Sequence, residues 1–469
     1  MDGTPAASGA APAVVPLRAN REFRLLWVGQ ALSDFGTAMT SLVLPLVLLR
    51  SGYSTSATSV IGTAVLVTAM VLRMPAGYLT DHYSHRRLML VADLARLVTV
   101  GAVAVWTYLD RLPIAMAVIT VVVAQVGVEL FRPSQNATVR RVVPAVQLGT
   151  AISLNQARAY AAGIVAPAVA GLLIAASLWL PFAIDAATYA VSALCVLALY
   201  RPLRRAEAAR RADRDAGAGA GDGAGGTGER TPGGADPARE EAEDSEEAVL
   251  AHMNGTGAKS EPRERFLPRL TAGLRYVVRN PFLRTIAGLA AGENFAFQAL
   301  AYALLLGIGR EHDGAAAVGL AMSAAAITGL TGSLIAPFLQ RRLRMQTVMA
   351  SGPALAGVML AVAWYTDSGI AFAAGYSALC LLTPVNGAVF GTILATTVPE
   401  NIYGRTTTAL GFVAEILQPL GPLAAGLLLS YLSLSGTAAL FALAFALLAA
   451  LALLMPSPPV TADAKTAAA

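Results

Sequence analysis

The stretch Gly77–Arg87 (GYLTDHYSHRR) joins two long apolar runs of the chain. The first run ends here, a single acid follows at Asp81, and two arginines begin the next run. A second copy, Gly332–Arg342 (GSLIAPFLQRR), lies 255 residues later with Ala336 in place of the acid. A polar hinge between two apolar runs, present in two unequal copies, predicts a duplicated membrane protein.

The composition is that of a chain that crosses a membrane many times. Of the 469 residues, 56% are hydrophobic and 13% are charged, whereas soluble domains have about 25% charged residues. The sequence therefore predicts an all-α integral membrane protein with about twelve transmembrane helices, each long enough to cross about 30 Å of hydrocarbon. The runs lie near 23–49, 57–79, 87–109, 113–132, 149–175, 181–200, 282–309, 315–339, 346–366, 370–394, 405–431 and 436–455.

Arginines are distributed unequally between the two sides of the membrane. With the N-terminus inside, the opposite loops receive only Arg50, Arg111 and Arg310. The positive-inside rule therefore predicts a multi-pass protein of the cell membrane with both termini cytoplasmic. The short inner loops receive Arg18, Arg21, Arg86, Arg87, Arg132, Arg140, Arg141, Arg341, Arg342, Arg344 and Arg405.

Composition also predicts the division of the chain. Residues 1–20 form a disordered cytoplasmic N-terminus, 21–200 a six-helix half, and 201–265 a flexible cytoplasmic linker with an acidic run at Glu240–Glu247. Residues 266–455 contain a second six-helix half, and 456–469 a cytoplasmic tail. The second half begins with Phe266–Asn280, whose spacing predicts an amphipathic helix on the inner membrane surface.

Two further pairs of segments share the offset of 255 residues. Pro144–Gly149 matches Pro399–Gly404, and Ala166–Gly171 matches Gly421–Gly426. Three matches in one register predict duplication of a six-helix unit. Two such halves around a site at the bilayer midplane form a secondary-transporter architecture.

These motifs resemble a known family. Gly77–Arg87 resembles the loop signature of the major facilitator superfamily, Gly-x-Leu-a-Asp-Arg-x-Gly-Arg-Arg/Lys. Asn20–Gln30 (NREFRLLWVGQ) and Pro181–Ala186 (PFAIDA) resemble the branch of bacterial exporters that includes the enterobactin exporter. The resemblance covers 20–455 and implies the major facilitator fold. It also implies that Asp81 switches between the two halves during transport.

The chain departs from the family signatures at several positions. His82, Ser84 and His85 replace an arginine, a glycine and a basic residue of the loop signature. Val121–Gly127 lacks the arginine that the family carries before a Gln-Gly pair. Ala166–Gly171 is a weakened form of a motif that the family associates with antiporters.

Four charged residues lie near the middle of predicted helices, where a charge costs about 2.5–3.5 kcal/mol. They are Asp34, Arg158, Glu293 and Glu415, and the two acids Asp34 and Glu293 take roughly equivalent places in the two halves. We hypothesise that they line a central cavity in which the acids bind a proton or a cationic substrate group. Arg158 then holds one acid ionised or binds an anion; the alternative is an ion pair that only locks helices together. Neutral polar neighbours are Asn294 and Gln298, with Gln30, Gln125, Asn155, Gln156 and Gln418.

A second charged set is predicted near the inner face and forms a conformational latch. Asp81 is expected to cap the positive N-terminus of the run 405–431 beside Arg405, joining the halves when the inner side closes. Asp93 and Arg96 are spaced i, i+3 and are expected to pair. Glu129 is a candidate partner for Arg86 or Arg73; the alternative is a set of static topology charges. The full latch set is Gly77, Asp81, Arg86, Arg87, Asp93, Arg96, Glu129 and Arg405, with Arg73 and Arg132 nearby.

Transport explains these features better than enzymatic or channel activity. No catalytic triad, metal spacing or nucleotide-binding loop is present, and Cys195 and Cys380 lie inside apolar runs as core residues. The arginines cluster at helix ends, which argues against nucleic-acid binding. The sequence predicts a monomeric, cofactor-free, proton-coupled exporter of a small amphipathic molecule such as a drug, siderophore or secondary metabolite. Proton-coupled uptake of a sugar or organic acid is the alternative, and symport, antiport and uniport stay open.

Overall fold

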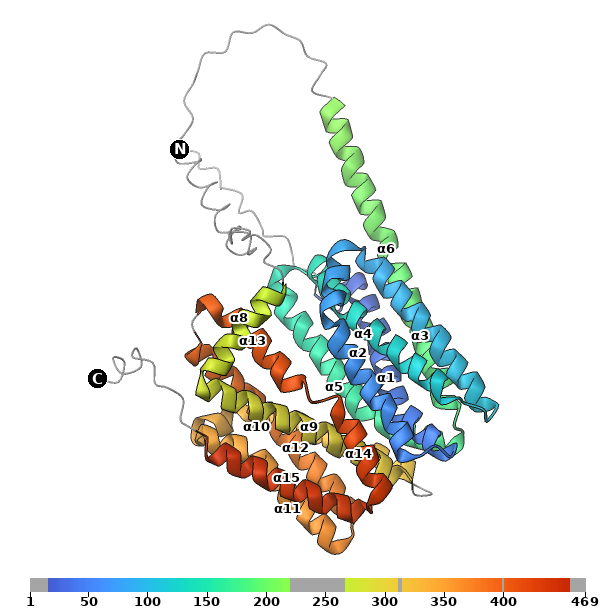
Figure 1. Ribbon diagram of the computed structural model, residues 1–469. Coiled ribbons are helices and arrows are strands. Elements are labelled where there is room, and N and C mark those ends of the chain that lie inside the picture. Colours follow the sequence, from blue (N-terminus) through green and yellow to red (C-terminus); the bar gives the residue numbers. More distant parts are fainter. Residues whose placement is uncertain (1–15, 220–265, 311–313, 399, 456–469) are drawn as a thin grey trace, which may run out of the picture.

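The computed structural model describes residues 16–219, 266–310, 314–398 and 400–455. Throughout these residues the regular structure is helical, with twelve helical stretches long and apolar enough to cross a membrane (Figure 1). The predicted all-α membrane fold is therefore confirmed. The N-terminal half contains α1 (Arg21–Arg50), α2 (Thr55–His82), α3 (His85–Tyr108), α4 (Ile114–Val142), α5 (Ala145–Ala176) and α6 (Leu180–Gly219). The C-terminal half contains α8 (Phe266–Arg279), α9 (Pro281–Gly309), α10 (Gly314–Arg342), α11 (Met345–Thr366), α12 (Gly369–Thr397), α13 (Glu400–Glu415), α14 (Leu420–Tyr431) and α15 (Leu434–Leu453).

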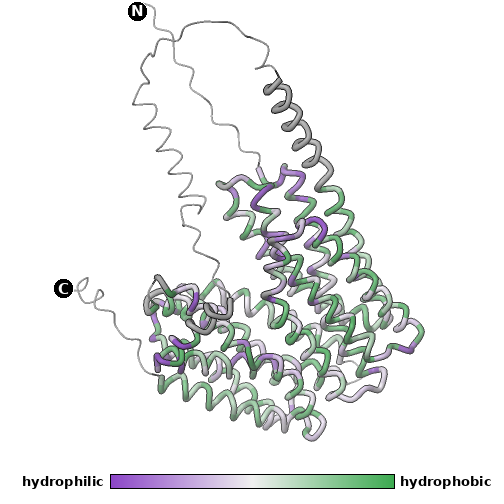
Figure 2. The backbone as a smooth tube through the Cα atoms, turned by 45° about the horizontal axis from the view of Figure 1, so that its top comes forward, coloured by the Kyte–Doolittle hydropathy of each residue, from purple (hydrophilic) through white to green (hydrophobic). Residues whose placement is uncertain are grey.

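The bundle has two ends. The linker face is the end from which α6 leaves the bundle and at which α8 begins (Figure 1). Figure 2 shows hydrophilic residues gathered at this end of the N-terminal half, while the helices themselves are largely hydrophobic. The distal end is opposite and carries the connections after α1, α3, α5, α9, α11 and α14.

The two halves meet near the distal end. The main contacts join α2 to α14, α5 to α10 and α1 to α9. Small residues allow close approach: Gly171 of α5 lies against the backbone of Ala315 and Ala316, and Gly319 of α10 lies against the Pro167 carbonyl. All of these residues belong to the distal parts of their helices, so the seam between the halves is a distal seam.

The run predicted as one helix over 405–431 is broken in its middle. It contains α13 and α14, separated by a turn whose hydrogen bonds run from the Gln418 amide to the Glu415 carbonyl (3.0 Å) and from Leu420 to Leu417 (3.1 Å). Pro419 supplies no amide for the regular helical bond to Glu415, which ends α13 at that point. Discontinuous helices of this kind expose backbone dipoles at membrane depth.

The duplication is visible in the helices, but its register differs from the predicted one. The helix starts are related by 260 residues in the first part of each half, as for Asn20 and Asn280, which both cap the helix that follows them. The offset falls to 255 from α4 and α12 onward, because α3 is two residues longer than α11 and the connection 109–113 is three residues longer than 367–368.

The predicted pairing of Gly77–Arg87 with Gly332–Arg342 is therefore wrong by five residues, whereas the other two pairs are in register. Arg86 and Arg87 begin α3, but Arg342 ends α10. Arginines are favourable both before and after a short inner loop, so the two arginine pairs matched although they lie on opposite sides of their loops. The hinge is also shorter than expected, since Tyr83 and Ser84 alone separate α2 from α3.

The segment between the halves is partly helical. The linker was predicted over 201–265, but α6 continues to Gly219, since its Ala- and Arg-rich continuation favours a helix. The rest of that linker, the tail 456–469 and residues 1–15 lie outside the described residues. The predicted helix at Phe266–Asn280 is confirmed as α8 over Phe266–Arg279, and its Gly273 packs against the Arg405 carbonyl of α13.

Candidate functional site

Asp34 of α1 and Arg158 of α5 form an ion pair inside the N-terminal half. Arg158 Nε lies 3.0 Å from Asp34 Oδ2, and the Gln30 side-chain amide donates to Asp34 Oδ1 at 3.0 Å. Arg158 is 8% exposed and Asp34 27%, so the pair is sheltered but reachable from one side. The structure thus brings together two of the predicted cavity residues, and both hypotheses for Arg158, holding an acid ionised and locking helices, are compatible with the contact.

A cavity of about 280 Å³ lies beside this ion pair. Asp34, Arg96 and Arg132 supply its charges, and Thr37 and Ser41 supply hydroxyls. The cavity is bounded by α1, α3, α4 and α5, so it belongs to the N-terminal half. It is large enough for water or for a small polar group of a substrate.

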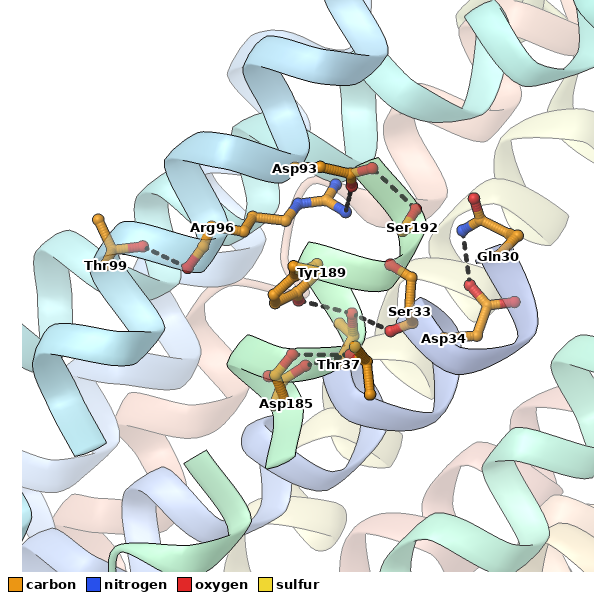
Figure 3. A network of polar contacts seen from close by, with 11 residues as sticks. Gln30, Ser33, Asp34, Thr37, Asp93, Arg96, Thr99, Asp185, Tyr189 and Ser192 are labelled. Atoms are coloured by element: carbon orange, nitrogen blue, oxygen red, sulfur yellow. Dashed lines mark hydrogen bonds and ion pairs between the residues drawn. The ribbon is translucent and has the colours of Figure 1, made fainter. Parts of the chain in front are cut away.

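Arg96 lies at the centre of a buried polar network (Figure 3). The predicted pair with Asp93 is confirmed, with a distance of 3.9 Å, and the Ser192 hydroxyl donates to Asp93 at 2.8 Å. The guanidinium lies over the rings of Phe131 (5.9 Å) and Tyr189 (5.4 Å). Asp93 and Arg96 are 0% and 2% exposed, so they bind helices of one half together. In this state they contact neighbours within the N-terminal half, and their predicted part in a latch between the halves stays a prediction.

The arginine that α4 lacks in its sequence has a substitute from α3. A Cβ atom placed on Gly127 of α4 would overlap the guanidinium of Arg96. A buried positive charge therefore lies against α4 after all, delivered by the neighbouring helix. The sequence of α4 alone could not predict this charge, because Arg96 belongs to α3.

Asp185 of α6 is buried, and no cation of the described residues is in bonding contact with it. Its carboxylate accepts hydrogen bonds from the hydroxyls of Thr40 (2.5 Å) and Thr188 (3.3 Å), and the side chain is 0% exposed. Gly36 of α1 makes room for it, since a Cβ atom there would overlap the carboxylate. Asp185 thus joins α1 to α6.

The predicted polar residues of the C-terminal half gather near the broken helix. The Asn294 side chain donates to the Ala414 carbonyl at 3.0 Å, and Gln298 packs against Gly421. One carboxylate oxygen of Glu293 is buried with no hydrogen-bond partner in the described structure. With the offset of 260, Asp34 corresponds to Asn294, so the predicted equivalence of Asp34 and Glu293 is off by one position.

Glu415 forms an ion pair across the two halves with Arg73 of α2. Glu415, predicted to line the central cavity, is thus the partner of Arg73, so the expected alternative of Glu129 with Arg73 is not found, and Glu129 with Arg86 stays a prediction. Glu129 instead accepts from the Gln125 side chain at 2.9 Å. The Thr63 hydroxyl also crosses the seam, donating to the Pro419 carbonyl at 3.0 Å. The broken helix is therefore held against α2 from both sides of its turn.

The remaining latch residues lie at the linker face. Gly77 and Asp81 fall in the last turns of α2, and Arg86 and Arg87 lie in the first turn of α3. The Asp81 side chain lies outside what the structure describes, so its predicted contact with α13 stays a prediction. Arg405 lies in the second turn of α13, against α8.

The site has no metal-binding character in the part of the chain that the structure describes. No group of three or more His, Cys, Asp or Glu side chains lies together there. Cys195 and Cys380 are free cysteines and form no disulfide bond, as expected of core residues. The chemistry that the arrangement offers is binding, through ion pairs and hydroxyls at membrane depth.

Two six-helix halves with polar side chains between apolar helices define a secondary membrane transporter. Residues 26–414 match the Major Facilitator Superfamily, and the chain belongs to that family. The protein is accordingly a transporter and not an enzyme.

Curated relatives are efflux proteins by name. The chain is 24% identical over 439 residues to the multidrug efflux pump Tap of Mycolicibacterium fortuitum, covering 90% of this chain and 92% of that protein. It is 27% identical over 158 residues to the macrolide efflux protein A of Streptococcus pyogenes, covering 34% of this chain and 38% of that protein.

Solved structures share the fold at low identity. A bacterial homologue of the iron transporter ferroportin, in an inward-facing state, has a TM-score of 0.63 at 14% identity, covering 93% of this chain and 97% of that one. The nucleoside transporter NupG has a TM-score of 0.64 at 10% identity, covering 92% and 98%.

Proposed function

We propose that the protein exports small amphipathic organic molecules by proton-coupled alternating access, as a monomer in the cell membrane. The names of the relatives support export, and the likeness to Tap extends over nearly the whole chain. We also place it in the exporter branch that includes the enterobactin exporter, on the strength of Asn20–Gln30 and Pro181–Ala186.

The observation that carries the proposal is the distribution of contacts between the halves. Thr55 of α2 donates to the Gly426 carbonyl (3.1 Å) at the distal end. The Arg73–Glu415 ion pair lies farther from that end, along the same seam. The halves therefore join distally, which is one of the two states that alternating access requires. If the arginine-rich linker face is cytoplasmic, this state is open to the inside and receives its substrate there.

Buried carboxylates support proton coupling. In the N-terminal half the carboxylates of Asp93 and Asp185 are buried, and that of Asp34 is sheltered beside the cavity. An isolated carboxylate in an apolar environment is more stable when protonated. These acids therefore offer positions for a proton in this half, and Glu293 offers one in the other half.

Transport in membrane vesicles tests direction and coupling together. Inside-out and right-side-out vesicles with an imposed pH gradient are loaded with candidate amphipathic compounds, and flux is measured with and without an uncoupler. We expect accumulation in inside-out vesicles that collapses with the gradient. Uptake in the opposite direction would favour the alternative, import of a nutrient such as a sugar or organic acid.

Two isosteric variants test the proton carriers. Asp34→Asn and Glu293→Gln keep side-chain volume and remove the ionisable group. We expect each variant to retain substrate counterflow and to lose accumulation driven by the pH gradient. If both variants keep full proton-driven transport, Asp34 and Glu293 do not couple protons.

We further propose that Asp81 closes the linker face in the other state by capping the N-terminus of α13. A helix N-terminus attracts a carboxylate, worth about 0.3–1 kcal/mol at an exposed site. Cytoplasmic labelling of a cysteine in the cleft should increase in Asp81→Ala, because the closed state would be less stable. An unchanged labelling rate would count against this role.

A further inference from the structure

A second pocket, separate from the ion pairs of the transport site, lies between α8 and α13 at the linker face. Its volume is about 270 Å³. Arg275, Tyr276 and Arg279 line it from α8, and Arg405 and Thr406 line it from α13. Among the described residues that line the pocket there are three guanidinium groups and no carboxylate.

The pocket has an electrostatic preference for anions. Three arginines offer several donors in fork geometry, which suits the oxygens of a phosphate. Arg405 and Thr406 belong to the second turn of α13, whose N-terminal end carries the positive end of the helix dipole. Both contributions have the same sign and act on the same volume.

Thr406 gives independent evidence for a ligand. The residue is 0% exposed and lines the pocket, yet its hydroxyl has no hydrogen-bond partner in the described structure. A buried hydroxyl without a partner is unfavourable. A phosphate oxygen in the pocket would accept a hydrogen bond from it.

The pocket is held at a fixed width by a close helix contact. Gly273 of α8 lies so near the Arg405 carbonyl of α13 that a Cβ atom there would overlap it. Val277 is buried on the same side of α8, 2% exposed, in the core that includes Leu410 of α13. The part of α8 that carries Arg275 and Arg279 is therefore held against α13, and both arginine side chains are exposed.

The depth of the pocket identifies the source of the phosphate. Arg279 lies two residues before the membrane span Pro281–Gly309, and Ile402 begins the span Ile402–Tyr431. The pocket thus lies where two spans enter the bilayer, at the level of lipid headgroups. We propose that it binds the phosphate of an anionic phospholipid headgroup, which Arg275, Arg279 and Arg405 contact and to which Thr406 donates.

Lipid binding by the purified full-length protein tests the proposal. The protein in neutral detergent is titrated with dioleoylphosphatidylglycerol, and separately with dioleoylphosphatidylcholine or inorganic phosphate, and bound lipid is counted by native mass spectrometry. We expect retention of one phosphatidylglycerol in preference to phosphatidylcholine. Arg275→Gln with Arg279→Gln should weaken its affinity by about tenfold or more, since charge-assisted hydrogen bonds are lost.

Two variants separate this site from general surface charge. Thr406→Val keeps the volume of the side chain and should weaken binding of phosphatidylglycerol by about threefold to tenfold, the worth of one hydrogen bond. Arg284→Gln removes an exposed arginine of α9 outside the pocket and should leave binding unchanged. Equal binding of both lipids, equal loss in Arg284→Gln, or binding of inorganic phosphate without retention of phosphatidylglycerol would overturn the lipid assignment.

Discussion

Asp34 and Arg158 place two opposite charges at membrane depth, where each charge stabilises the other. Breaking a buried ion pair by removing one partner leaves an uncompensated charge, at a cost of about 3 kcal/mol or more, reduced here because Asp34 is 27% exposed. We therefore expect Arg158→Gln to lower the free energy of unfolding by about 2 kcal/mol. Thermal unfolding of the purified protein measures the change.

The double variant separates pairing from packing. In Asp34→Asn with Arg158→Gln no charge is left behind, so we expect at least half of the lost stability to return. A double variant that loses the sum of the two single losses would show that the residues do not act as a pair.

Arg96 and Gly127 provide a second prediction at the scale of single residues. The guanidinium is enclosed by Phe131, Tyr189 and α4, so it cannot move away from a new methyl group. Gly127→Ala should destabilise the protein by about 1–3 kcal/mol, as overpacking does. Gly101→Ala on α3 is the matched control, because its nearest outside atom, on Ala186, would be 4.0 Å from the new Cβ. Equal melting temperatures for the two variants would contradict the enclosure.

At the scale of elements, the break between α13 and α14 depends on one proline. Pro419→Ala supplies the missing amide and favours a continuous helix, since proline in a helix interior costs about 3 kcal/mol. We expect higher thermal stability but transport that is several-fold slower, because the Thr63 contact and the Arg73 ion pair both attach at the turn. Flux in vesicles at equal protein content gives the rate.

Pro422→Ala is the control for this experiment. Pro422 lies in the first turn of α14, beyond the break, so its missing amide does not separate the two helices. Its replacement should change stability and transport little. If Pro419→Ala behaves like Pro422→Ala, the break does not contribute to transport.

The helices could be predicted from sequence because each one is long and apolar, and burial in lipid leaves a backbone few other choices. The register of the repeat was harder to predict. Its correct signal, the capping asparagines Asn20 and Asn280, stands at the start of each half, but the arginine pairs at the inner loops are a stronger and misleading match. Local similarity cannot reveal a register that changes partway along the chain.

At the scale of the whole molecule, Arg73–Glu415 is an ion pair between the halves. Its partners are 58% and 36% exposed, so we expect it to contribute about 0.2–1 kcal/mol to the distally joined state. Arg73→Glu or Glu415→Arg removes this attraction and adds repulsion between like charges, so opening of the distal seam should increase by about fivefold or more. Alkylation of Ser59→Cys reports that opening, because Ser59 is 0% exposed and packs against Gly426.

The reciprocal exchange, Arg73→Glu with Glu415→Arg, is the control. It restores opposite charges and should return the alkylation rate toward that of Ser59→Cys alone. A rate that stays high in the exchanged protein would show that the charges do not interact across the seam. The native Cys195 and Cys380 are replaced by serine in all of these proteins.

Contacts between the halves could not be predicted from sequence. Residue spacing predicted the depths of Asp34, Arg158 and Glu415 in the bilayer. Asp34 and Arg158 lie at similar depth in the same half, which is compatible with the ion pair that they form. The partner of Glu415 lies on a helix more than 300 positions away in the chain, and several arginines share its approximate depth. Only the packing of α2 against α14 selects Arg73 among them.

The unequal length of two equivalent connections has a practical consequence. The segment 109–113 between α3 and α4 is three residues longer than 367–368 between α11 and α12. Asp110 and Asp367 turn the chain there with the same left-handed backbone, at φ 53° and 49°. An epitope inserted at 367–368 would repeat what the other half already tolerates, and antibody access to intact cells would then report which side of the membrane that end faces.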